Sequence, residues 1–97
     1  MAGYWVVRTS DIADEEAYQE YSRHWAPIAE KYGASFLVGP QGRHEAREGP
    51  DFPRVLVVEF PSYEQAVACY DDPDYQESLP FSRICFTERD LVIVESE

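Results

Sequence analysis

The sequence predicts an α+β domain whose strands and helices follow one another in the order β-α-β-β-α-β. Three observations support this prediction. Four short segments are rich in aromatic and β-branched residues, as strands are. Two other segments combine helix-capping residues with apolar side chains spaced three and four positions apart. The 97 residues suffice for one hydrophobic core but not for two, so we expect a single domain over residues 1–97.

The first strand and the first helix are predicted between residues 3 and 32. Gly3–Thr9 contains the run YWVV, which is typical of a strand. Asp14 is a good N-cap, and the glutamates that follow it suit the positive end of a helix dipole. We expect a solvent-side kink at Pro27 and a left-handed helix end at Gly33. The apolar side chains of this helix form one stripe, made by Tyr18, Tyr21, Trp25, Ile28, Ala29 and Tyr32.

Two further strands are predicted at Ser35–Val38 and at Arg54–Phe60. The second of them is the clearest strand in the chain, because it is a continuous apolar run flanked by prolines. Between them, Arg43–Phe52 is polar and contains a Gly-Pro pair. We therefore expect this segment to form a long hairpin connection.

The remaining elements are a second helix, a short third helix and a last strand. A Ser-x-x-Gln capping box at residues 62–65 begins the second helix. Asp72-Pro73 ends it and caps a further short helix through residues 75–79, since proline suits the first helical position. The last strand is predicted at Asp90–Glu95, and we expect the segment Pro80–Asp90 to be helical in part.

This order of elements is that of the ferredoxin-like unit, a four-stranded antiparallel sheet with the helices on one face. In Arg54–Phe60 and in Asp90–Glu95, however, residues on both alternating sides are apolar. The face without helices would then expose Val, Leu and Ile to water, which soluble monomers seldom do. We expect a two-fold homodimer that packs sheet on sheet, a dimeric α/β barrel. The alternative is that Arg43–Phe52 and the C-terminal segment cover this face.

The charge of the chain restricts the classes of partner. Eight basic residues face 19 acidic ones, which gives a formal net charge of -11. Such an acidic protein repels nucleic acid and anionic membranes, so we expect neither as a partner. A cationic or neutral small molecule is not disfavoured by this charge.

The sequence contains no signature of a metal or cofactor site. Cys69 and Cys85 form no CxxC pair and have no histidine at a zinc-like spacing, which suits a reducing cytoplasm. A nucleophile elbow and a phosphate-binding glycine loop are absent as well. Neither a signal peptide nor an apolar run of transmembrane length is present. We therefore expect a cytoplasmic protein that uses no metal and no cofactor.

Four segments carry a resemblance to a known family. They are PIAEKYG at Pro27–Gly33, FLV at Phe36–Val38, Glu48-Gly49 followed by PRVLVVEFPS at Pro53–Ser62, and YDDPDYQ at Tyr70–Gln76. Over nearly its whole length the sequence resembles the bacterial family called domain of unknown function 1330. The resemblance implies the fold of the dimeric α/β-barrel superfamily and its sheet-on-sheet dimer. It implies no activity, because none is assigned to the family.

The sequence departs from the family pattern after the second predicted strand. Gly39-Pro40-Gln41-Gly42 stands where relatives more typically have Arg-Gly-Gly, so that only Arg43 could replace an arginine there. Superfamily relatives include cofactor-independent monooxygenases, haem-degrading enzymes and muconolactone isomerases. Those chemistries are analogies at the level of the fold and assign no residue here.

Two residues are candidates for catalysis. His24 lies beside Trp25 on the first helix, and its imidazole would serve as a general base if it faced a pocket between helix and sheet. Arg83 matches an arginine that is common before the last strand in the family, and it would clamp a carboxylate or an enolate. The alternatives are an exposed histidine beside the apolar stripe and an arginine paired with a nearby surface carboxylate.

An aromatic cavity is the candidate ligand site, with four expected contacts: Tyr21, Trp25, Tyr70 and Tyr75. The alternative is that these residues only pack in the core with their polar tips in water. Two functions remain open on the sequence. One is a cofactor-independent small-molecule enzyme of isomerase or monooxygenase type, and the other is a non-catalytic homodimer that binds a small ligand or serves a structural role.

Overall fold

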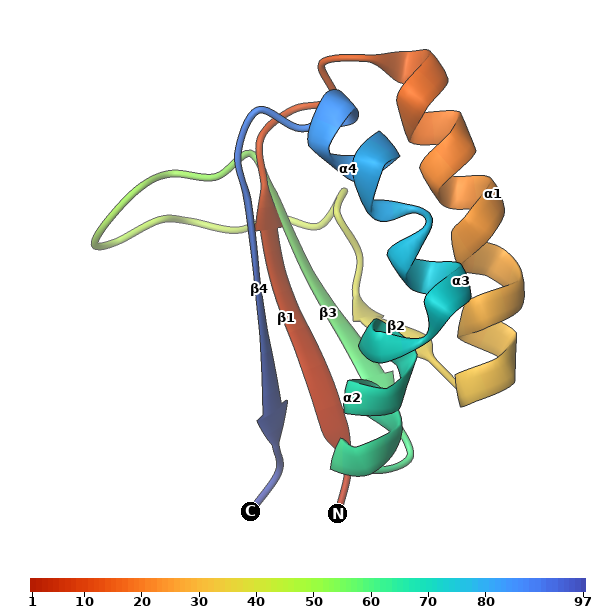
Figure 1. The fold of residues 1–97 in the computed structure, drawn as a ribbon. Coiled ribbons are helices and arrows are strands. Elements are labelled where there is room, and N and C mark those ends of the chain that lie inside the picture. Colours follow the sequence, from red (N-terminus) through yellow and green to blue (C-terminus); the bar gives the residue numbers. More distant parts are fainter.

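The computed structural model describes residues 1–97 as a four-stranded antiparallel sheet with helices on one face (Figure 1). The strand order is β2-β3-β1-β4. This confirms the predicted α+β class and its ferredoxin-like arrangement. In chain order the elements are β1 Gly3–Thr9, α1 Glu15–Tyr32, β2 Ser35–Val38, β3 Arg54–Phe60, α2 Tyr63–Asp71, α3 Pro73–Gln76, α4 Leu79–Cys85 and β4 Arg89–Glu95.

The predicted capping residues begin and end the helices. The Asp14 carboxylate accepts a hydrogen bond from the Ala17 N–H at 2.9 Å, and the Ser62 hydroxyl accepts one from the Gln65 N–H at 3.1 Å. Gly33 ends α1 in the left-handed region, with φ of 68°. These contacts are local, which is why the sequence pattern identifies them.

The segment between α2 and β4 differs from the prediction. The short helix after Asp72 is α3, which ends at Gln76, and α4 then fills the first half of the segment Pro80–Asp90. The last strand begins one residue earlier than expected, at Arg89, because Thr9 of β1 pairs with it. Helix α4 packs against α1, and the two residues that follow it reach α1 as well: the Phe86 ring packs on Tyr18, and Arg89 donates a hydrogen bond to Tyr21. None of the helices is both long and apolar enough to span a membrane.

The core lies between the sheet and the helices and is centred on Trp5. Its side chain is 2% exposed, and its indole N–H donates to the Ala66 carbonyl oxygen at 2.9 Å. Four aromatic rings pack around it at centroid distances of 5.2–6.0 Å: Trp25, Phe60, Tyr70 and Tyr75. Three of these rings, those of Trp25, Tyr70 and Tyr75, belong to the expected ligand contacts, and here they pack around Trp5.

The opposite face of the sheet, which we call the open face, has no helix over it (Figure 1). Val6 of β1 lies at its centre, paired with Val57 of β3 and Val92 of β4. The Val92 side chain is 56% exposed. The long β2–β3 connection projects away from the sheet in Figure 1 and is exposed over residues 41–51, so it leaves this valine cluster uncovered.

Asp72 joins the end of α1 to the start of α3. Its carboxylate accepts hydrogen bonds from the Tyr32 hydroxyl at 2.6 Å, the Lys31 ammonium at 2.9 Å and the Asp74 N–H at 2.8 Å. The Tyr32 hydroxyl first, and then Lys31 and the Asp74 N–H, lower the pKa of Asp72 from 3.8 to about 2. The carboxylate is thus favoured in the folded state.

This pKa predicts an acid-sensitive contribution to stability. Because the folded pKa lies below the unfolded one, the contribution is complete above about pH 4 and is lost as the pH falls toward about 2. We expect Asp72→Asn to reduce stability at neutral pH and to flatten the acid limb of stability against pH. Urea denaturation at a series of pH values measures this, with the exposed neighbour Asp71→Asn as the matched control. An acid limb equally steep in Asp72→Asn and the wild type would contradict this role.

Candidate functional site

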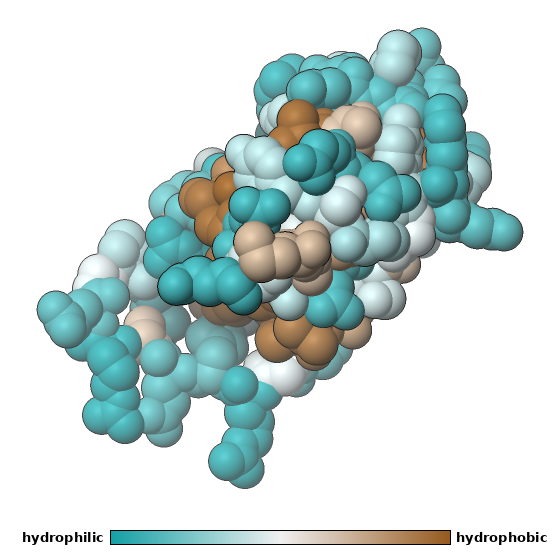
Figure 2. Space-filling view, turned by 90° about the horizontal axis from the view of Figure 1, so that it is seen from below, coloured by the Kyte–Doolittle hydropathy of each residue, from teal (hydrophilic) through white to brown (hydrophobic).

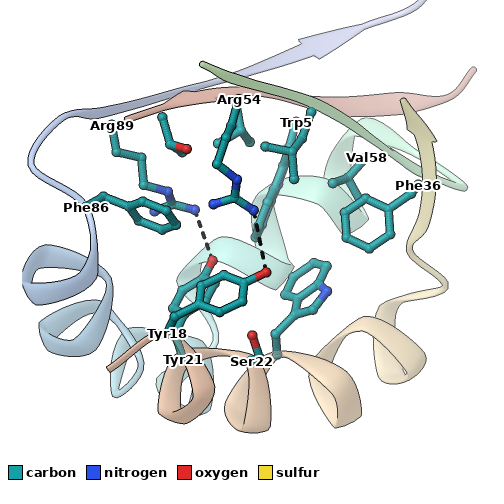
Figure 3. A pocket seen from close by; sticks show the side chains of 13 residues that line it. Trp5, Tyr18, Tyr21, Ser22, Phe36, Arg54, Val58, Phe86 and Arg89 are labelled. Atoms are coloured by element: carbon teal, nitrogen blue, oxygen red, sulfur yellow. Dashed lines mark hydrogen bonds between the residues drawn. The ribbon is translucent and has the colours of Figure 1, made fainter. Parts of the chain in front are cut away.

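A cavity lies between α1 and the helix-covered face of the sheet, and nine of its 13 lining residues are hydrophobic. The centre of a water molecule has about 80 Å³ in which to move there, several times the roughly 10–15 Å³ that one water needs. Trp5, Phe36 and Val58 line one end of the cavity (Figure 3), and Trp25 packs there against Trp5 and Phe36. Two arginines, Arg54 and Arg89, reach into the other end from the sheet (Figure 3).

The sheet register brings the two arginines together. Thr9, the last residue of β1, pairs with Arg54 at the start of β3 on one side and with Arg89 at the start of β4 on the other. Residues paired in neighbouring strands point to the same face of a sheet. Both long side chains therefore extend toward α1 from the same end of the sheet.

Arg54 is a buried cation with few partners. The residue is 9% exposed, and its Nη2 donates one long hydrogen bond of 3.5 Å to the Tyr18 hydroxyl. Its guanidinium lies 5.3 Å from the ring centroid of Tyr18 and 5.2 Å from that of Phe86. A guanidinium has five N–H donors, so most of those of Arg54 remain free for a ligand.

Arg89 is held by two phenols. Its Nη2 donates to the hydroxyl oxygens of Tyr21 at 3.0 Å and Tyr75 at 3.1 Å, and these two oxygens are 2.8 Å apart. Burial by itself lowers the pKa of Arg89, but Tyr21 and Tyr75 outweigh it and the pKa is raised. Burial also raises the pKa of Tyr21 well above 10, with Tyr75 adding to the rise and Arg89 opposing it in part. At neutral pH the arginine is charged and Tyr21 is protonated.

Neither arginine has a carboxylate partner. The four ion pairs of the structure involve Arg8, Arg23, Lys31 and Arg47. The chain has eight basic residues against 19 acidic ones, and two of the eight lie unpaired in one apolar cavity. The net charge of -11 therefore does not describe this site, which is locally positive.

Of the predicted ligand contacts, only two line the cavity. These are Tyr21 and Trp25. Tyr75 is fully buried behind them and reaches the site only through its hydroxyl contacts to Tyr21 and Arg89. Tyr70 packs on Trp5 and lines a second hollow between α4 and β4, which shares Phe86 and Arg89 with the cavity.

The structure does not bring His24 and Arg83 together. The His24 ring stacks on Phe81 at 5.8 Å and lines a surface hollow on another side of α1, with Lys31 and Asp74. Arg83 is exposed on α4 and lines the hollow that also contains Tyr70. Neither side chain lines the cavity of the two arginines. The condition for His24 as a general base, that it face a pocket between helix and sheet, is therefore not met by this cavity, because its ring packs on Phe81 of α4.

Other chemistry-bearing groups do not converge here. No three His, Cys, Asp or Glu side chains are arranged to hold a metal ion. Both cysteines are free and buried, and burial raises the pKa of the Cys69 thiol to about 12. The cavity thus offers hydrogen-bond donors, aromatic surface and positive charge.

The two arginines were missed as site residues by sequence reasoning. Each stands at the start of an apolar strand, which is one signal that could have identified them. The signal was incomplete, because both faces of these strands are apolar and the sequence does not say which face the helices cover.

Comparison with solved structures places the fold among proteins of similar architecture. A protein of unknown function from Rhodopseudomonas palustris has a TM-score of 0.74 and 20% identity, covering 99% of this chain and 82% of that one. A dimeric ferredoxin-like protein of unknown function from Jannaschia sp. CCS1 has a TM-score of 0.64 and 16% identity, covering 99% and 100%. A putative antibiotic biosynthesis monooxygenase from Nitrosomonas europaea has a TM-score of 0.58 and 18% identity, covering 98% and 88%.

These identities show likeness of fold alone. No curated protein matches the sequence. The model of one family, described as a domain of unknown function, matches residues 2–96. The chain therefore belongs to the DUF1330 family, as the sequence motifs indicated.

Proposed function

We propose that this protein is a homodimer that binds a small molecule with an anionic group in the cavity of each protomer. The observation that carries the proposal is the pair of carboxylate-free guanidinium groups in an apolar cavity, that of the buried Arg54 and that of the half-buried Arg89. Burying a charge without a partner is costly, and proteins seldom keep such a group unless something compensates it. A bound anion would compensate both arginines.

The lining favours binding through donated hydrogen bonds. Besides the arginines, the polar groups on the cavity wall are hydroxyls, from Thr9, Tyr18, Tyr21 and Ser22. Carboxylate and phosphate oxygens are acceptors that arginine meets with short, charge-assisted hydrogen bonds. The wall includes no carboxylate and no imidazole, so it holds an anion better than it removes a proton from one.

A cofactor-independent enzyme is the second candidate. It is favoured by one observation, that the Tyr21 hydroxyl and both guanidinium groups line the same cavity, since such donors stabilise negative charge that develops on an enolate oxygen. The Nitrosomonas neighbour described as a putative monooxygenase is consistent with this candidate. An enzyme of this kind would still bind an anion first, so the first test is the same.

Dimerisation through the open face completes the proposal. Valines of three strands, Val6, Val57 and Val92, meet there, and exposed apolar patches of this kind mark interaction surfaces. Figure 2 shows that apolar surface emerges in patches from an otherwise hydrophilic exterior, which is what an acidic chain with an uncovered sheet presents. Structural neighbours from three organisms are described as dimeric.

Thermal unfolding with butyrate and with its uncharged analogue butyramide, at constant ionic strength, tests the binding. A ligand at ten times its Kd stabilises the folded state by about 1.4 kcal/mol, which raises the Tm of a domain of this size by roughly 5 °C or more. We expect butyrate to raise the Tm and butyramide to leave it unchanged. The shift is expected to disappear in Arg54→Gln and to persist in Arg83→Gln, an exposed arginine outside the cavity. Equal shifts from the two compounds would contradict the proposal.

A further inference from the structure

We infer that the ligand is an aromatic carboxylate, bound with its carboxylate between Arg54 and Tyr21 and its ring against Trp25 and Phe36. This inference rests on the proposed function, because it names the class and the orientation of the anion. Three features of the cavity carry it: its polarity from end to end, the unequal partnering of its two arginines, and the aromatic character of its apolar end.

The polarity of the cavity sets the orientation. The guanidinium groups lie side by side at one end, next to Phe86 and the Tyr18 and Tyr21 hydroxyls (Figure 3). Trp5, Val58 and Phe36 lie toward the other end (Figure 3). Phe36 is 55% exposed, so this apolar end is the one that opens to solvent. A ligand therefore places its charged group inside and its apolar part at the mouth.

The partnering of the arginines separates their roles. Arg89 already donates to Tyr21 and Tyr75, so we assign it as a positioning residue that holds the two phenols. Arg54 has one hydrogen bond, at 3.5 Å, so its remaining donors are the ones that meet the carboxylate. An arginine that presents two parallel N–H groups matches the two oxygens of a carboxylate.

A count of phenolic hydrogens adds Tyr21 to the ligand contacts. Tyr21 and Tyr75 together carry two hydroxyl hydrogens, and Arg89 supplies donors only. Tyr75 is 0% exposed, and Tyr21 is the acceptor within its reach, so Tyr75 donates to Tyr21. The Tyr21 hydrogen is then left without an acceptor. Tyr21 lines the cavity, so this hydrogen is available to one carboxylate oxygen.

The walls at the apolar end favour a flat ring. Trp25 packs near Trp5 and near Phe36, with centroids 5.3 Å and 6.4 Å apart. Aromatic rings gain beyond simple burial when their centroids lie about 4.5–7 Å apart in tilted or offset geometry. A planar aromatic ring packs more closely against these side chains than a saturated ring with the same number of carbon atoms.

Calorimetric titration with four probes tests the inference on the wild-type protein: benzoate, cyclohexanecarboxylate, acetate and benzamide, all at constant ionic strength. We expect benzoate to bind at least about tenfold more tightly than acetate and measurably more tightly than cyclohexanecarboxylate, since burial of the ring adds apolar contact. We expect benzamide not to bind. If benzoate bound no more tightly than acetate or cyclohexanecarboxylate, the inference would be overturned and the proposed function would remain. Benzamide as tight as benzoate, or no binding by any carboxylate, would overturn the proposed function as well.

Two variants locate the ring and the carboxylate. Phe36→Ala is expected to weaken the binding of benzoate by about tenfold without changing the binding of acetate, because the Phe36 phenyl group contacts only the ring of the ligand. Tyr21→Phe is expected to weaken both carboxylates by a similar factor, since the phenolic hydrogen meets the charged group. Arg83→Gln is the matched control and is expected to change neither. A Phe36→Ala protein that binds benzoate as the wild type does would overturn the orientation. Phe36 is more than half exposed, so its truncation leaves the core intact.

Discussion

Replacing Arg54 by methionine is expected to abolish anion binding while leaving the protein as stable as before, or more stable by about 1–3 kcal/mol. Methionine keeps most of the apolar stem that packs on Tyr18 and Phe86 and removes a buried charge that has no carboxylate partner. A residue whose removal stabilises the fold is retained for what it binds. Urea denaturation measures the stability, and calorimetric titration with benzoate measures the binding.

Arg89→Met is the matched comparison and is expected to have the opposite effect on stability. It leaves the buried Tyr75 hydroxyl without one of its two partners, which costs about 1–2 kcal/mol. Arg83→Met, on the exposed face of α4, is expected to change neither stability nor binding. If Arg54→Met destabilised the protein as much as Arg89→Met does, Arg54 would be a structural residue. The proposed role in binding would then lose its main support.

Val92→Glu is expected to separate the proposed homodimer into monomers, raising its dissociation constant by at least about 100-fold, equivalent to about 2.7 kcal/mol. The side chain is 56% exposed in a single protomer, so the glutamate costs little in the monomer. In a sheet-on-sheet dimer the same position lies in an apolar interface beside Val6, where an unpaired carboxylate is costly. Light scattering across a dilution series measures the assembly.

Ile84→Glu is the control for this substitution. Ile84 is 57% exposed, which matches Val92, but it lies on α4 at the helical side of the sheet. We expect the dimer to persist in this variant. A wild-type protein that is monomeric at low micromolar concentration, or equal dissociation of both variants, would contradict assembly through the open face.

Local signals explain why the elements were predictable. Asp14, Ser62 and Gly33 begin or end helices through contacts with residues no more than four positions away. The strands stood out for a similar reason, since β1 and β3 are short apolar runs between polar or proline-containing segments. The capping residues and the strand composition agree with the fold, and this agreement made the order of elements clear.

The site was harder to predict because it depends on register and rotation. His24 and Trp25 are neighbours in sequence, but one residue turns an α-helix by about 100°, which carries His24 away from the cavity that Trp25 lines. Arg54 and Arg89 meet only because both pair with Thr9. This pairing involves three strands that are distant in sequence, so no local sequence pattern could reveal it. Arg83 lies on α4. The sequence predicted only that this segment is helical in part, so the direction of the Arg83 side chain could not be derived.

Nuclear magnetic resonance of the arginine side chains during titration with benzoate tests the binding of an anion at the two buried guanidinium groups most directly. The chain has few basic residues, so the guanidinium signals of individual arginines are resolvable. We expect the Nε–H signals of Arg54 and Arg89 to shift and saturate together, while that of the exposed Arg83 stays in place. Benzamide is expected to shift none of these signals. Saturable shifts confined to exposed arginines, with Arg54 unmoved, would contradict binding at the two guanidinium groups.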